Sequence, residues 1–81
     1  MGVGEGTQVA EVADYITCQY RDRVESVMTG LLELGIKVTN VSHEYNGPHA
    51  SGLFTVWFYR PDAEDVCLKV RAIRYQYGAG R

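Results

Sequence analysis

The chain has 81 residues, of which 46% are apolar and only two are prolines, and this fits one small folded domain and argues against a disordered chain. Its formal charge of −2 is unfavourable for a protein that binds nucleic acid mainly through phosphate contacts. Because the chain lacks both a long apolar run and the pattern of a signal peptide, we expect a cytoplasmic protein without membrane contacts.

Glycines are concentrated at the two ends, so we expect flexible termini over residues 1–7 and 78–81 around a domain at 8–77. The first segment of that domain fits two patterns. Residues 15–20 alternate like a strand, whereas the apolar residues between 9 and 16 also satisfy helical spacing. We predict a strand over 13–20.

A helix is predicted to begin at Asp22. The run from Asp22 to Glu25 has the form of a capping box, in which an N-terminal acceptor is followed three residues later by a glutamate. Apolar residues then recur at helical spacing as far as Leu34, and Gly35 suits a left-handed residue that ends the helix.

Two strands should follow as an antiparallel pair. Residues 36–45 are rich in β-branched side chains, but Val38 and Val41 would fall on opposite faces, which predicts a bulge near Asn40. A turn at residues 46–48 leads to the second strand, at 53–60.

Pro61 and Asp62 are predicted to open a second helix. Because residues 73, 75 and 77 alternate, residues 74–77 are also compatible with a short last strand. The predicted fold class is therefore α+β: a ferredoxin-like βαββα(β) plait with two helices on one face of an antiparallel sheet.

The strand at 53–60 is apolar or aromatic on both faces, and two helices can cover only one of them. Alternation sends Phe54, Val56 and Phe58 to one side. The other side then carries a candidate protein interface with Trp57 as its anchor, made of Leu53, Thr55, Trp57, Tyr59 and, from the first strand, Tyr15. The alternative is that residues 3–12 fold back and cover these side chains.

Basic residues are concentrated after Tyr59. We predict a possible anion contact at Arg60, Lys69, Arg71 and Arg74, although such residues near a helix end often only complement its dipole. The RNA-recognition motif has a similar strand signature, but Leu53 and Thr55 stand where its stacking rings belong. Nucleic-acid binding is therefore disfavoured.

No motif predicts catalysis, a metal or a cofactor. Cys18 and Cys67 lie far apart and are expected to be buried thiols of a reducing compartment, while His43 and His49 fall in different elements. His43-Glu44 has no recognisable nucleophile nearby. The chain is expected to be a non-enzyme.

Residues 14–74 resemble the ACT-domain family of small regulatory modules. The resemblance lies in residues 31–42, a helix end that turns into a strand, and in residues 54–58 followed by 61–66. It implies the plait and a tendency to dimerise. In the loop where that family binds amino acids, only Asp22 and Arg23 match, since Val24 and Glu25 replace the expected proline and glycine.

These observations favour a non-catalytic interaction or regulatory module that self-associates or docks on a larger protein through its open sheet face. A small phage-type inhibitor of a host complex, a single-stranded nucleic-acid-binding protein and an amino-acid sensor are the alternatives.

Overall fold

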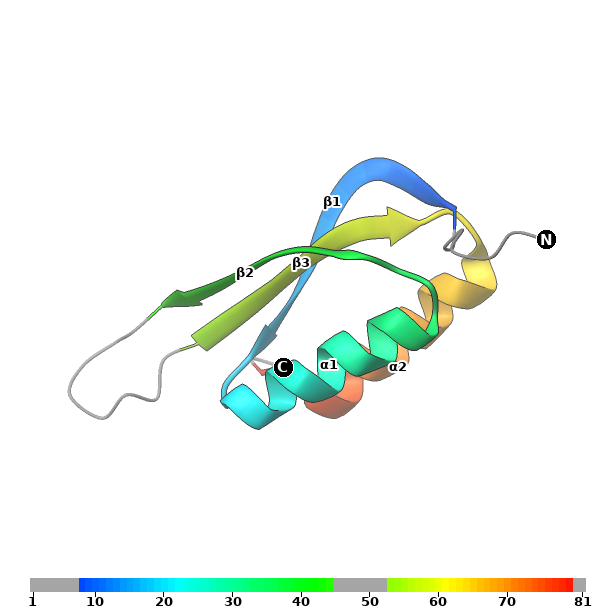
Figure 1. The fold of residues 1–81 in the computed structure, drawn as a ribbon. Helices are drawn as coiled ribbons and strands as arrows, with labels where there is room; N and C mark the ends of the chain where they lie inside the picture. The colour runs from blue at the N-terminus through cyan, green and yellow to red at the C-terminus, as the bar shows by residue number, and fades with distance from the viewer. Residues whose placement is uncertain (1–7, 45–52, 80–81) are drawn as a thin grey trace.

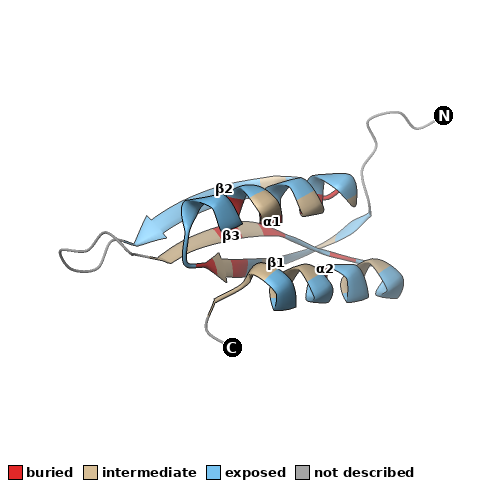
Figure 2. Ribbon diagram, turned by 90° about the horizontal axis from the view of Figure 1, so that it is seen from below, coloured by how far each residue is buried: buried red, intermediate tan, exposed pale blue. Residues whose placement is uncertain are grey.

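The computed structural model describes residues 8–44 and 53–79. Its elements are β1 (Val9–Cys18), α1 (Arg21–Glu33), β2 (Val38–Glu44), β3 (Leu53–Pro61) and α2 (Glu64–Tyr77). The three strands form an antiparallel sheet in the order β1-β3-β2. Both helices lie on one face of this sheet, with α1 towards β2 and α2 towards β1 (Figures 1 and 2). The predicted α+β class is confirmed.

The first segment is a strand, as predicted, and the helical alternative is wrong. β1 begins at Val9, four residues earlier than expected, and ends at Cys18. Its register with β3 shifts between Val9 and Ala13, because four residues of β1 span two residues of β3, from Pro61 to Tyr59. From Ala13 onward the pairing is regular.

α1 differs from the prediction at its start and agrees at its end. It begins at Arg21 with Tyr20 as N-cap and has no side-chain cap, so the predicted capping box at Asp22 is wrong. The Tyr20 carbonyl accepts the N–H groups of Arg23 and Val24, which places Asp22 inside the first turn. Gly35 follows the helix with φ of 78°, as predicted for a left-handed terminator.

The bulge predicted near Asn40 is confirmed. Val38 pairs with Phe58 and Asn40 pairs with Trp57, so Thr39 is the extra residue on β2. The bulge brings Val38 and Val41 to the same face of the sheet, the one that bears the helices.

The C-terminal part is helical, and the predicted strand at 74–77 is wrong. α2 continues to Tyr77 because Ile73 and Tyr77, one turn apart, both pack against the core. It also starts later than predicted, at Glu64, because β3 extends to Pro61.

The core lies between the helices and the sheet. Its buried members are Ile16, Cys18, Val24, Val27, Leu31, Ile36, Val56, Phe58 and Val70. Full burial of one large aliphatic or aromatic side chain stabilises a fold by roughly 1.5–3 kcal/mol. All of this apolar burial is on the helix side, so the other face of the sheet has no comparable covering layer among the described residues.

The predicted turn at 46–48 and the predicted flexible residues 1–7 lie outside the described residues.

Candidate protein-docking site

The face of the sheet opposite the helices carries the side chains predicted to form an interface. We call Tyr15, Trp57 and Tyr59, with the flanking Leu53 and Thr55, the aromatic cluster. Phe58 and Val56, at even positions of β3, are buried under the helices, so the odd positions must point the other way. Tyr15 reaches the same face because it pairs directly with Trp57.

The rings of Tyr15 and Trp57 pack side by side, and no other part of the described chain covers the aromatic cluster. The centroids of Tyr15 and Trp57 are 5.0 Å apart with a tilt of 44°, within the range of favourable aromatic pairs. Tyr15 is 50% exposed and Tyr59 45% exposed, while Trp57 is half-buried by its neighbours. The sheet therefore presents a preformed aromatic surface.

The β2 side of the same face is polar. Asn40, Ser42 and Glu44 pair with Trp57, Thr55 and Leu53 in turn, and all three are exposed. An apolar centre with a polar margin is the usual composition of a protein–protein interface.

The alternative in which residues 3–12 cover this face is wrong for the part that can be seen. Residues 9–12 belong to β1 itself, and Val9 and Val12 are exposed. Residues 3–7 lie outside the described residues, as does His49.

The four basic residues predicted to contact an anion do not join the aromatic cluster. Lys69 lines a groove between α1 and α2, and Arg71 is exposed on α2, so both are on the helical side of the sheet. Arg60 follows Tyr59 on β3 and points to the opposite side.

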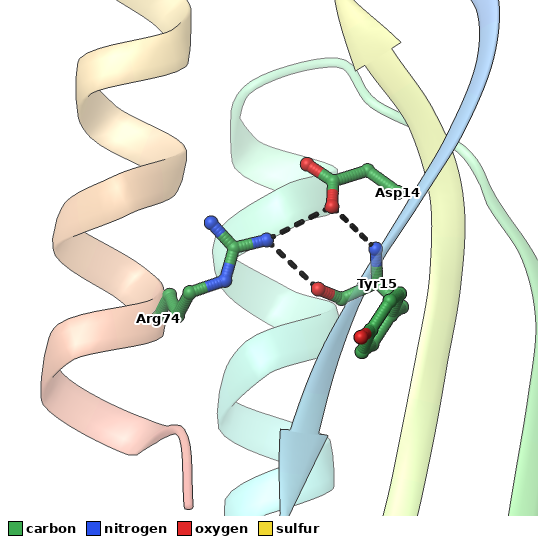
Figure 3. Close-up of polar contacts among 3 residues, drawn as sticks. All are labelled: Asp14, Tyr15 and Arg74. Atoms are coloured by element: carbon green, nitrogen blue, oxygen red, sulfur yellow. Dashed lines mark hydrogen bonds and ion pairs between the residues drawn. The ribbon is translucent and has the colours of Figure 1, made fainter. Parts of the chain in front are cut away.

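Arg74 has a structural role at the outer edge of β1. Its Nη2 donates to the carbonyl of Tyr15 at 2.8 Å and to Oδ1 of Asp14 at 3.1 Å, and the same Asp14 oxygen accepts the Tyr15 N–H at 2.8 Å (Figure 3). The Asp14 and Arg74 side chains therefore bind the N–H and C=O of Tyr15 as the backbone of a neighbouring strand would. We call this pair the edge clamp.

A second contact covers the same edge. The N–H of Ala79, just after α2, donates to the Thr17 carbonyl at 2.6 Å. A pocket of about 570 Å³ lies beside this contact, with the edge clamp, Thr17 and Leu53 in its wall. No local pattern predicts the clamp, because 60 residues separate Asp14 from Arg74.

The cysteines and His43 are positioned for packing. Cys18 is fully buried, and burial raises the pKa of its thiol even though Arg23 acts in the opposite direction. Cys67 is half-buried and its Sγ donates to the Pro61 carbonyl at 3.2 Å. His43 stacks on Phe54 at 4.1 Å. Within residues 8–44 and 53–79, no three His, Cys, Asp or Glu side chains form a group suited to a metal ion.

The residues that match the amino-acid-binding loop of ACT domains lie at the start of α1. Arg23 donates from Nη1 to the Gln76 carbonyl at 3.5 Å, a long contact that joins α1 to α2. Asp22 lines the groove between these helices together with Glu25 and Lys69. These contacts are between the chain's own elements.

The chain matches no family model, no curated protein and no solved structure. In the described part of the chain, neither helix is long and apolar enough to cross a membrane.

Proposed function

We propose that this chain is a non-catalytic protein-interaction module that docks on a protein partner through the aromatic cluster. The observation that carries the proposal is that Tyr15 and Tyr59 are about half exposed beside Trp57 on an uncovered sheet face. Contiguous apolar surface of this kind marks interaction sites on soluble proteins. Tryptophan and tyrosine are also the residues that most often dominate binding energy at interfaces.

In this proposal the half-buried Trp57 is the anchor, because its indole is already held in place by Tyr15. A preorganised ring loses little conformational freedom when a partner covers it. Tyr59 and Leu53 extend the contact along β3, and Asn40 and Ser42 supply hydrogen bonds at the polar margin. Such a module regulates or inhibits its partner by contact alone.

We further propose that the fold is the ferredoxin-like plait of ACT-like regulatory modules, and that this chain has the plait without its last strand. Two observations support this. The element order βαββα places β3 between β1 and β2, with both helices on one face. The contact of Ala79 with Thr17 brings the segment after α2 alongside β1, where a fourth strand of a plait would pair.

Nothing in the arrangement favours nucleic-acid binding over protein binding. A single-stranded nucleic acid would have to stack its bases on the rings and place its phosphates against basic side chains on the same surface. Here Arg74 is occupied at the edge clamp, and Lys69 and Arg71 lie on α2, across the sheet from the aromatic cluster.

Affinity capture from cells with matched tyrosine variants tests the proposal. Tyr59→Ser removes an exposed ring from the aromatic cluster, whereas Tyr75→Ser removes a 74% exposed ring from α2. We expect the wild type and Tyr75→Ser to recover the same dominant partner. Tyr59→Ser should bind that partner about tenfold more weakly, the loss typical of an interface hot spot.

The opposite pattern, in which Tyr75→Ser loses the partner and Tyr59→Ser keeps it, would place the interface on the helices. Circular dichroism of both variants serves as the control for folding.

A further inference from the structure

The two outer strands of the sheet, β1 and β2, differ in how the rest of the chain satisfies their outward backbone groups. On β1, the edge clamp occupies both the N–H and the C=O of Tyr15, and Ala79 occupies the C=O of Thr17. β2 is the outer strand on the other side, and no described segment pairs beyond it. Natural proteins usually shield exposed edges, because unpaired backbone groups there can bind another strand.

The direction of the backbone groups on β2 follows from the register. The outward carbonyls of Tyr15 and Thr17 show that residues 55 and 57, their partners on β3, turn their own N–H and C=O groups towards β2. Asn40 and Ser42 pair with Trp57 and Thr55, so their own N–H and C=O groups are directed towards β3. Val41, between them, therefore points its N–H and C=O outward.

We infer that a second copy of this chain pairs with the outer edge of β2 in antiparallel fashion, which joins the two sheets into one of six strands. The inference does not depend on the proposed docking function, because the β2 edge and the aromatic cluster are separate surfaces.

The sequence of β2 suits pairing with itself. A two-fold axis perpendicular to the sheet at Val41 places the two Val41 residues opposite each other, and Asn40 opposite Ser42 of the second copy. No like charges meet in this register. Glu44 at one end of the seam comes near Lys37 of the second copy at the other end, so the only charges at the seam are of opposite sign.

An apolar strip beside the edge adds to the contact. On α1, Met28 and Leu32 are 37% and 73% exposed and lie one turn apart on the side turned away from α2. That side is towards β2 (Figure 2), where Val41 is 39% exposed on the same face. A stable interface buries roughly 1,200–2,000 Å² in total, so burial of this strip must accompany strand pairing.

The pairing has a geometric consequence for docking. Because the two-fold axis is perpendicular to the sheet, both open faces lie on the same side of the dimer. A partner with two matching sites can then bind both aromatic clusters of the dimer at once. Its binding becomes tighter through avidity, without any new type of contact.

The first test is the molar mass in solution by light scattering. The wild type should have twice the mass of a 9.1 kDa chain, and Leu32→Glu and Val41→Pro should have the mass of one chain. Proline is tolerated at Val41 because its lost N–H points away from β3. Leu68→Glu, at a 56% exposed leucine of α2, and Trp57→Ala should remain dimeric.

A wild type with the mass of one chain overturns the inference. So does dissociation by Trp57→Ala but not by Leu32→Glu, which would move self-association to the aromatic cluster and leave the docking proposal standing.

The second test is a disulfide across the axis. Directly opposed residues in a hydrogen-bonded antiparallel pair have Cα atoms about 5.5 Å apart, which suits a disulfide. In a Cys67→Ser background, where the remaining native Cys18 is fully buried, Val41→Cys should form covalent dimers on mild oxidation and Leu68→Cys should not. Equal cross-linking of the two variants would contradict the assigned seam.

Discussion

At the scale of single residues, the edge clamp shows how a surface ion pair can have a structural role. The Arg74 and Asp14 side chains are 40% and 33% exposed, so their mutual attraction in water contributes little by itself. Their main contribution is to the backbone of Tyr15. Asp14 accepts the outward N–H of Tyr15, and Arg74 donates to its outward C=O. Without them, this stretch of β1 would be an open edge.

Arg74→Ala is therefore expected to lower the free energy of unfolding by about 1 kcal/mol, the usual net contribution of a hydrogen bond with a charged donor at a partly exposed site. Arg71→Ala, one turn earlier on α2, should change it by less than about 0.5 kcal/mol. Urea denaturation of the two variants measures the difference. Equal effects would show that the clamp does not stabilise β1.

Cys18 gives a prediction for pH. Its folded pKa lies above the value of 9.0 taken for the unfolded chain, because burial opposes the thiolate. Well below pH 9 the thiol is neutral in both states and does not affect stability. As the pH rises above 9, the unfolded chain ionises first, so the free energy of unfolding should fall.

Cys18→Ala should reduce this loss of stability above pH 9, as measured by urea denaturation at pH 8 and pH 10. An unchanged difference between the two pH values would assign the effect to other groups. Alkylation of the native protein should modify Cys67 faster than Cys18.

At the scale of elements, local sequence patterns determined most of the secondary structure. The apolar spacing of α1, the glycine that ends it and the bulge near Asn40 were all predictable, because each depends on neighbouring residues. The prediction of a capping box at Asp22 was wrong because the helix begins earlier, at the backbone carbonyl of Tyr20. The prediction of a last strand was wrong because Ile73 and Tyr77 pack on the core only if α2 continues.

Gly35 is the terminator on which the turn from α1 to β2 depends. Its φ of 78° is costly for residues with a Cβ atom, so Gly35→Ala should lower the free energy of unfolding by about 1 kcal/mol. Glu33→Ala, two residues earlier and exposed, is the matched control and should have almost no effect. A neutral Gly35→Ala in thermal unfolding would mean that the turn adapts to a different backbone conformation.

At the scale of the whole molecule, the division of the sheet into a covered and an uncovered face was predictable from alternation along residues 53–60. The members of the aromatic cluster were identified in the same way, since one strand supplied four of its five residues. The bonding of Arg74 to Asp14 and Tyr15 was not predictable, because it depends on how α2 packs against β1. The difference between the two sheet edges likewise arises from contacts between residues far apart in sequence.

Docking through the aromatic cluster is tested most directly by hydroxyl-radical footprinting, read by mass spectrometry, of the isolated chain and of its complex with the captured partner. We predict that Tyr15, Trp57 and Tyr59 are oxidised in the isolated chain and protected in the complex, while Leu68 and Tyr75 on α2 react equally in both. Protection of Leu68 and Tyr75 with unchanged oxidation of Tyr59 would contradict docking through the aromatic cluster.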